Sequence, residues 1–215
     1  MFFAVAQYIS GSISWLLLKL FTDLRIEGRQ NLRELTRPFI VVSNHESHLD
    51  PQLTGVALIS RPDLFPLRYM AKNKLFHYPI FGQVIWLLGA FKAHKKKGIG
   101  KSLLTPTRIL ERGGSLIMFP EGRIIPERPV LGEGRRGAAI LALTTRAALL
   151  PMSLHTPANF SLIDFLFRRK PVVIRIGTPF YLNNLEYMDF SDENTYRATQ
   201  VIMQKISDLY FQHQY

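Results

Sequence analysis

The sequence predicts a single α/β domain, with a mixed central sheet flanked by helices and a membrane-associating helix at the amino terminus. Short apolar runs alternate with helical segments along the chain, which is typical of this class. The 215 residues, 47% of them hydrophobic, suffice for one core but hardly for two. The first 18 residues carry no charge. We therefore expect a membrane-associating helix over 1–24 and an α/β domain over 25–215.

Five apolar runs have the length of strands and are often bounded by Gly or Pro. They are Phe39–Ser43, Leu67–Met70, Ser115–Phe119, Leu149–Ser153 and Val172–Gly177. The sequence predicts helices between and after them, at Gln52–Ile59, Lys101–Arg112, Gly137–Arg146 and Asn194–Phe211. This alternation favours a sheet with helices packed on its faces.

The amino-terminal stretch Met1–Phe21 contains one charged residue, Lys19, among many large apolar side chains. About 20 apolar residues suffice to span a bilayer, but Gln7, Gly11 and several serines interrupt the run. We therefore expect a helix that lies in the membrane interface or inserts shallowly. The alternative is a terminal helix packed on the core of a soluble protein.

The charge balance indicates an anionic partner. Lys and Arg number 27 against 16 Asp and Glu, so the formal net charge is +11. No acidic residue occurs from Leu64 to Leu110, although this segment holds nine cations around the apolar stretch Leu75–Phe91. Basic residues beside bulky aliphatic ones suit a membrane surface better than nucleic acid, for which the chain has no recognised binding motif. The alternative for the basic run His94–Lys97 is a solvated loop.

The segment Asn44–Pro51 carries the first candidate site. Asp50 followed by Pro51 is typical of a helix start. His45 and Asp50 do not face each other along a continuous helix, so they meet only if a turn folds between strand and helix. Such turns lie at the carboxyl edge of a sheet, where sites are usually built. A His–Asp pair there can act as a general base; the alternative is a strand-end histidine, and His48 lies near enough to compete.

The segment Phe119–Arg123 carries the second candidate site, again at the end of an apolar strand. Glu121 and Arg123 flank Gly122, whose backbone can approach a ligand closely. The Arg123 guanidinium is suited to bidentate phosphate binding. The alternative is an ordinary turn with a surface ion pair. The chain has no cysteine, which excludes disulfides, thiol nucleophiles and zinc held by cysteine.

Taken in order, these segments resemble the glycerophospholipid acyltransferase family, of which lysophosphatidate acyltransferase is the best-known member. The matching motifs are Asn44-His45-x4-Asp50, Lys72-x-x-Leu75-Phe76-x-x-Pro79-x-x-Gly82, Gly89-x-Phe91, Phe119-Pro120-Glu121-Gly122-Arg123 and Leu150-Pro151-Met152. The resemblance covers roughly Ile26 to Thr178. The combination of the first motif with Phe-Pro-Glu-Gly some seventy residues later is specific, whereas neither half is so alone.

The resemblance implies transfer of a fatty acyl chain from a coenzyme A or acyl carrier protein thioester to the free glycerol hydroxyl of a lysophospholipid, in phospholipid biosynthesis or remodelling. His45 would be the base and Asp50 its orienting partner. Glu121, Gly122 and Arg123 would belong to the acceptor-binding motif, with Lys95 a further phosphate contact. Lys72, or backbone amides near it, would stabilise the oxyanion.

The resemblance also implies the cofactors, the partners and the location of the protein. No metal or redox cofactor is required, because the thioester is a co-substrate. The partners would be membrane phospholipids, the lysophospholipid acceptor and the acyl donor, and the chain would lie on the cytoplasmic face of a membrane as a monotopic or peripheral protein, the inner membrane if it is bacterial. Leu75–Phe91 would line an acyl tunnel or dip into the bilayer, with core packing as the alternative for part of it.

Two motifs depart from the family's pattern. His94 and Lys95 stand where the family has an acidic residue followed by Arg, and Arg123 follows Gly122 directly where the family usually has Thr before Arg. These departures leave the acceptor open. The alternatives are an acyltransferase for glycerol-3-phosphate or for another lyso-lipid and, from a different class, a non-catalytic lipid-binding protein of the membrane.

Overall fold

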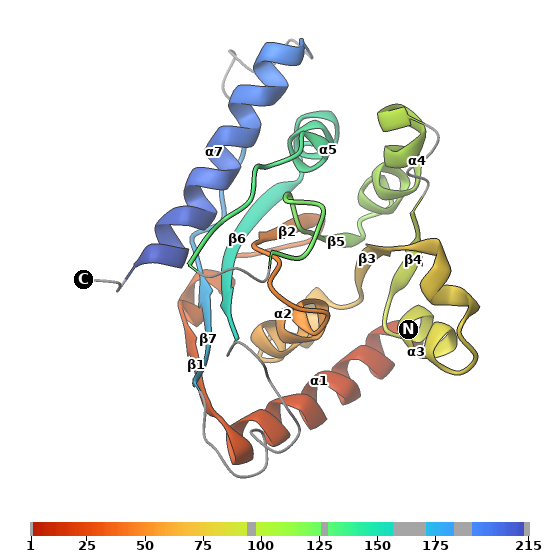
Figure 1. Cartoon of the computed structure of the whole chain (residues 1–215), viewed down its shortest axis with the longest axis vertical. Coiled ribbons are helices and arrows are strands. Elements are labelled where there is room, and N and C mark those ends of the chain that lie inside the picture. Colours follow the sequence, from red (N-terminus) through yellow and green to blue (C-terminus); the bar gives the residue numbers. More distant parts are fainter. Residues whose placement is uncertain (1, 94–97, 126–128, 157–170, 183–190, 213–215) are drawn as a thin grey trace.

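The computed structural model describes residues 2–93, 98–125, 129–156, 171–182 and 191–212. Its centre is one sheet of seven strands in the order β1-β7-β6-β2-β5-β3-β4 (Figure 1). The strands are β1 (Asp23–Glu27), β2 (Phe39–Ser43), β3 (Leu67–Ala71), β4 (Ala90–Lys92), β5 (Ser115–Met118), β6 (Ala148–His155) and β7 (Pro171–Ile176). All neighbouring pairs are parallel except β6 and β7. The expected mixed sheet is thus confirmed.

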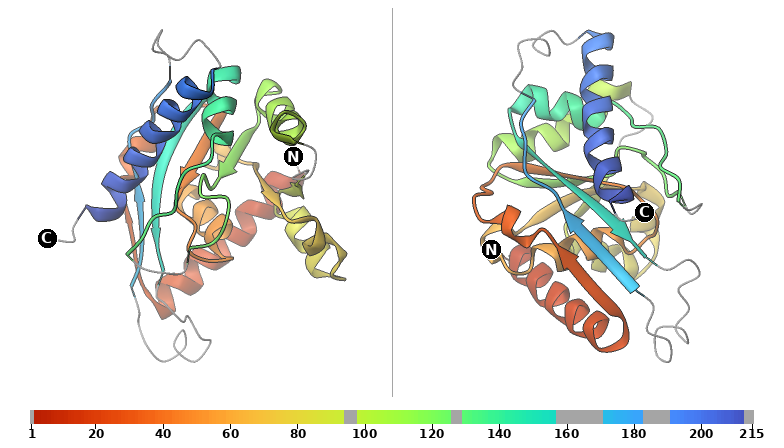
Figure 2. Two further views of the ribbon diagram at one scale, coloured as in Figure 1. Left: turned by 45° about the horizontal axis from the view of Figure 1, so that its top comes forward. Right: turned by 90° about the vertical axis from the view of Figure 1, so that its left-hand side faces the viewer.

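Helices cover both faces of the sheet (Figures 1 and 2). They are α1 (Phe2–Phe21), α2 (Asp50–Leu58), α3 (Phe81–Leu87), α4 (Gly98–Glu111), α5 (Gly137–Thr145) and α7 (Asp192–Phe211), with 3-10 turns η1 (Arg29–Leu32), η2 (Pro62–Leu64) and η3 (Asn73–His77). Helices α1 and α2 pack on one face, and α4, α5 and α7 pack on the other.

Strand β2 shows why the central strands read as continuous apolar runs. Phe39 and Val41 point into the core beneath α2, whereas Ile40 and Val42 point into the core beneath α5 and α7. Because both faces are covered, every residue of β2 is buried. The carboxyl ends of β2, β5 and β3 lie at one edge of the sheet, since these strands are parallel.

The five expected strands and four expected helices are confirmed, with ends that differ by at most three residues. Sequence reasoning missed β1 and β4, which are the two edge strands. Strand β1 has the sequence DLRIE, in which three of five residues are charged, and β4 has only three residues. Neither resembles a buried apolar run. The boundary expected after residue 24 falls inside β1, which pairs with β7.

Helix α1 is fixed to the domain by buried polar contacts. The Gln7 side chain is buried; its amide nitrogen donates to Leu67 O (2.7 Å) and Leu88 O (2.9 Å), and its amide oxygen accepts from Leu67 N (2.8 Å). Gln52 of α2 donates to the hydroxyls of Ser10 and Ser14. Gln7, Ser10 and Ser14, which interrupt the apolar run, therefore face the domain. Of the large apolar side chains of α1, Trp15 and Leu18 pack on the core, and most of the others are exposed.

Candidate active site

A turn at the carboxyl end of β2 brings His45 and Asp50 together. Nδ1 of His45 lies 2.7 Å from Oδ2 of Asp50. The same carboxylate oxygen accepts from the backbone N–H groups of Glu46 (2.7 Å) and Ser47 (2.9 Å), and the other oxygen accepts from the Ser47 hydroxyl (2.6 Å). Asp50 is fully buried, and these four hydrogen bonds satisfy it there.

This arrangement sets the proton positions on the imidazole. An ionised carboxylate only accepts, so Nδ1 of the neutral His45 ring carries the hydrogen and Nε2 is left as the proton acceptor. The His45 side chain remains 18% exposed, so part of it is open to solvent. His48 is exposed, and the carboxylate that would orient a base is bonded to His45 instead. A histidine oriented in this way can act as a general base.

Asn44 fixes the end of β2, a role that the sequence analysis did not assign. Its amide nitrogen donates to Leu154 O and its amide oxygen accepts from Leu154 N, both at 2.8 Å. Asn44 is buried, so this pair of bonds joins β2 to β6 immediately before His45. The sequence shows only that Asn44 stands between an apolar strand and His45. It does not show the hydrogen-bond partner Leu154, which lies 110 residues away.

Glu121 joins the second motif to the first. One carboxylate oxygen accepts from His45 N (2.7 Å) and the other from Gly132 N (2.7 Å). Burial raises the pKa of Glu121 above its ordinary value, while the N–H groups of Gly132 and His45 act in the opposite direction. Glu121 was expected in the acceptor-binding motif; in the structure both of its oxygens bind backbone amides, so any contribution to acceptor binding passes through the position of that backbone.

The segment after Glu121 also holds His45. The backbone N–H of Ile125 donates to His45 O at 2.7 Å. The His45 ring stacks on the Phe119 ring, with centroids 4.1 Å apart and planes at 12°. His45 is thus held by the turn that follows β5 in three ways: its N–H and C=O are hydrogen-bonded to this turn, and its ring stacks on it.

Gly122 and Arg123 form the outer part of this turn. Gly122 has φ of +66°, in the region that favours glycine, and its N–H donates to Phe119 O. A Cβ at Gly122 would lie 2.8 Å from the Arg135 side chain, so Arg135 covers this glycine. Arg123 and Arg135 are both exposed. The structure therefore places a second arginine, which sequence reasoning missed, against the glycine that precedes Arg123.

Two expected site residues remain, Lys72 and Lys95. Lys72 is exposed and follows β3, so it lies at the same edge of the sheet as His45, two strands away. No hydrogen bond within the described ranges joins it to His45 or Asp50. Lys95 lies outside the described residues. Within the part of the chain that the structure describes, no group of three or more His, Asp and Glu side chains could hold a metal ion.

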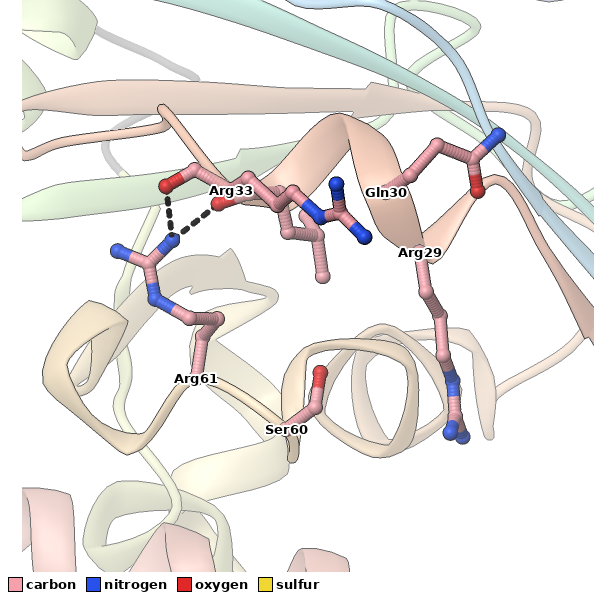
Figure 3. Close-up of a pocket in the computed structure, with 6 residues that line it drawn as sticks. Arg29, Gln30, Arg33, Ser60 and Arg61 are labelled. Atoms are coloured by element: carbon pink, nitrogen blue, oxygen red, sulfur yellow. Dashed lines mark hydrogen bonds between the residues drawn. The ribbon is translucent and has the colours of Figure 1, made fainter.

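A cavity of about 400 Å³ lies elsewhere, between η1 and the end of α2 (Figure 3). It is lined by Arg29, Gln30, Leu32, Arg33, Ser60 and Arg61. Arg61 donates to the carbonyls of Leu32, Arg33 and Leu35, so it satisfies the backbone of η1. Because β1 runs opposite to β2, η1 lies at the edge of the sheet away from His45. This cavity is therefore separate from the dyad.

Comparisons with known proteins agree with the motifs. The family model described as Acyltransferase matches residues 23–155. A 1-acyl-sn-glycerol-3-phosphate acyltransferase of Bacillus subtilis (strain 168) is 24% identical over 193 residues, which cover 90% of this chain and 91% of the relative. The enzyme of the same name from Streptococcus pneumoniae is 25% identical over 183 residues, 85% of this chain and 65% of the relative.

The fold is also shared with a solved structure. The 1-acyl-sn-glycerophosphate acyltransferase PlsC of Thermotoga maritima superposes with a TM-score of 0.67 at 21% identity, covering 96% of this chain and 79% of that one. The matched region of the family model contains both His45–Asp50 and Phe119–Arg123. The chain therefore belongs to the acyltransferase family, among the glycerophospholipid acyltransferases of the 1-acyl-sn-glycerol-3-phosphate acyltransferase type.

Proposed function

We propose that this acyltransferase moves a fatty acyl chain from a thioester to the free glycerol hydroxyl of a lysophospholipid, with His45 as general base. The hydrogen bond of 2.7 Å between His45 Nδ1 and the buried Asp50 carboxylate is the observation that carries the proposal. Lysophosphatidate is the acceptor that the relatives' names suggest. The donor is an acyl-coenzyme A or an acyl carrier protein thioester.

The proposed step needs one base and no covalent intermediate on the protein. Nε2 of His45 takes the proton of the hydroxyl as its oxygen attacks the thioester carbonyl, and Asp50 stabilises the imidazolium that forms. The tetrahedral oxyanion then collapses, the C–S bond breaks, and the imidazolium returns the proton to the leaving thiolate. The products are an ester and a thiol. Lys72, or backbone amides near it, is the proposed donor to the oxyanion.

The acceptor phosphate is proposed to bind at the turn after β5. Arg123 and Arg135 are exposed there; Arg123 follows Gly122 in the chain, and the Arg135 side chain covers Gly122. A guanidinium can donate two parallel hydrogen bonds to a phosphate. Glu121 ties this turn to the backbone of His45, so a phosphate held at the turn would place the neighbouring hydroxyl at a fixed position relative to the base. Lys95 remains a proposed phosphate contact outside the described residues.

We propose further that α1 lies in the membrane interface. The helix has the length and hydropathy of a membrane span, and only 11% of its apolar window is buried in the protein. Gln7, Ser10 and Ser14 nevertheless bind the domain over the middle of the helix. A helix held in this way presents one apolar face outward instead of crossing the bilayer. Its exposed apolar side chains are Phe2, Val5, Tyr8, Ile9, Ile13, Leu16, Leu17 and Leu20.

Helix α3 extends the same apolar surface. Phe3 of α1 packs edge to face on Trp86 of α3, with ring centroids 4.9 Å apart. Ile80, Phe81, Val84 and Trp86 are exposed, whereas Ile85 and Phe91 are buried. Leu75–Phe91 is therefore part surface and part core. Exposed Lys72, Lys74 and Lys92 lie near this surface in the sequence and suit anionic headgroups. We propose that the protein binds the cytoplasmic face of the membrane, which is the inner membrane if the chain is bacterial.

The function is tested with a labelled acyl thioester and a panel of acceptors. We expect product with a lysophospholipid, and the panel includes glycerol-3-phosphate and amine-headgroup lyso-lipids because the acceptor motif departs from the family's pattern. His45→Ala should abolish transfer, whereas the matched control His48→Ala, at an exposed neighbour, should retain it. Near-normal turnover of His45→Ala would contradict the proposal. Binding of lipid without a single turnover by the parent would favour a non-catalytic lipid-binding protein.

Membrane association is tested by flotation with anionic liposomes. Ile13→Asp together with Leu17→Asp places two charges on the exposed face of α1 and should release the protein from liposomes. Leu104→Asp is the control, because Leu104 is equally exposed but lies on α4, in the opposite helical layer. Equal flotation of all variants would contradict an interfacial α1.

A further inference from the structure

A second buried carboxylate, Glu46, lies within the catalytic turn. One of its oxygens accepts from the Tyr210 hydroxyl at 2.7 Å, and the other accepts from Thr156 N at 3.1 Å. Tyr210 is 164 residues further along the chain, in the last turn of α7, and is almost fully buried. Glu46 therefore joins the His45 turn to the carboxyl-terminal helix.

The backbone of Glu46 connects this contact to the dyad. Its N–H donates to Oδ2 of Asp50 at 2.7 Å, and this is the oxygen that accepts from His45 Nδ1. A movement of Glu46 would thus displace a donor from the oxygen that orients the base. Displacement by a fraction of an ångström matters, because a misplacement of about 1 Å can cost about a hundredfold in rate.

Tyr210 is itself held firmly. Its ring stacks on the His155 ring with centroids 4.4 Å apart. Arg175 Nη1 donates to His155 Nε2 (3.0 Å) and to Leu209 O (3.2 Å), and Arg175 Nε donates to Glu27 (2.9 Å). These contacts fix the far end of the Glu46–Tyr210 hydrogen bond to strands β6, β7 and β1.

We infer that Glu46 and Tyr210 are positioning residues for acyl transfer: their buried hydrogen bond holds the His45–Asp50 geometry from the carboxyl-terminal helix. The catalytic part of this inference rests on the proposed function. Neither residue touches the reacting atoms. Glu46 stands at a position between the His and the Asp of the first motif, and Tyr210 lies beyond the region matched by the family model.

The first test is Tyr210→Phe, which removes one hydroxyl and keeps the ring that stacks on His155. We expect kcat to fall by about 5- to 20-fold while the KM values for donor and acceptor stay within about twofold, because the position of the base changes and the substrate contacts do not. Tyr196→Phe on the same helix is the matched control, since Tyr196 is exposed. Glu46→Gln, which keeps an acceptor oxygen, should retain more kcat than Glu46→Ala.

The second test reads His45 without turnover. The experiment monitors the proton on His45 Nδ1 by NMR, where we expect its resonance at low field, and assigns the resonance by its loss in His45→Ala. Its resonance should shift in Tyr210→Phe and stay in place in Tyr196→Phe. If the parent transfers no acyl group to any acceptor, the proposed function fails, while this shift still decides whether Tyr210 positions His45. An unchanged resonance, a parental kcat, or a loss confined to thermal stability in Tyr210→Phe would overturn the inference.

Discussion

Replacing Asp50 with Asn isolates the charge of the dyad from its geometry. If the Asn oxygen takes the place of Oδ2, it can accept from His45 Nδ1, Glu46 N and Ser47 N as before. The Asn NH2 group then faces the Ser47 hydroxyl, which can rotate and accept instead of donating. The turn should therefore survive, and what is lost is the negative charge beside the imidazolium.

The magnitude follows from the distance between the charges. The N···O separation is 2.7 Å, so the charge centres of ring and carboxylate are about 4 Å apart, where two unit charges attract by about 4 kcal/mol at an effective dielectric constant of about 20. If half the charge has developed in the transition state, the loss is about 2 kcal/mol. The expected fall in kcat is therefore about 30-fold for half the charge and about 1,000-fold for the whole charge.

The assay compares kcat for Asp50→Asn and Asp208→Asn with the same labelled thioester. Asp208 is an exposed aspartate on α7 that accepts from Gln204, so its replacement should leave kcat unchanged. Circular dichroism and thermal denaturation report whether the fold is intact. If Asp50→Asn folds and retains more than about a third of the parental kcat, the carboxylate does not stabilise the imidazolium and the dyad assignment fails.

Three further predictions concern neighbouring contacts. Arg123→Ala should raise the acceptor KM by about tenfold or more with little change in the donor KM, as expected for the loss of a charged phosphate contact; an unchanged acceptor KM would argue against its phosphate role. Burial raises the pKa of Glu121 above its ordinary value, so the folded chain binds this proton more tightly than the unfolded chain. The contribution of Glu121 to the free energy of unfolding should therefore fall as the pH rises from the pKa of the unfolded chain through that of the folded chain. Urea denaturation should show that the free energy of unfolding of the parent, relative to that of Glu121→Gln, decreases from acid to neutral pH. A difference that does not depend on pH would refute this. Gln7→Leu leaves both backbone groups of Leu67 without their side-chain partner, which should cost about 2–4 kcal/mol and lower Tm by about 5–15 °C; a decrease under about 2 °C would show that Gln7 does not fix α1.

The buried strands were predictable because their signals are local, whereas the dyad was predictable only together with the second motif some seventy residues later. Phe39–Ser43 is buried on both faces, so its whole sequence is apolar. His45 and Asp50 are five residues apart, and one turn brings them together. Strand β1 was not predictable in the same way, because its charged residues fit a strand only when β7, about 150 residues later, lies beside it.

Contacts between distant parts of the chain explain what the sequence analysis could not assign. The pattern placed Glu121 in a ligand-binding motif, whereas its oxygens accept from amides 76 and 11 residues away. Gln7 appeared only as an interruption of an apolar helix, and its partner Leu67 is 60 residues further on. Hydrogen-bond partners at such separations leave no periodic signal in the residues between them.

The catalytic turn illustrates why such distant contacts are needed. Where the chain leaves β2, its backbone groups lose the partners that a sheet provides and must find others if they are buried. Asp50 accepts from the N–H groups of Glu46 and Ser47, and Glu121 accepts from that of His45. The Asn44 side chain joins the start of the turn to Leu154 of β6, and Glu46 adds a link to α7. Burying three carboxylates costs solvation free energy, as the raised pKa of Glu121 indicates. The buried carboxylates lie where an imidazole must be held in one tautomer and one orientation. Because their hydrogen bonds restrain the backbone there, the turn is held in the geometry that the proposed chemistry requires.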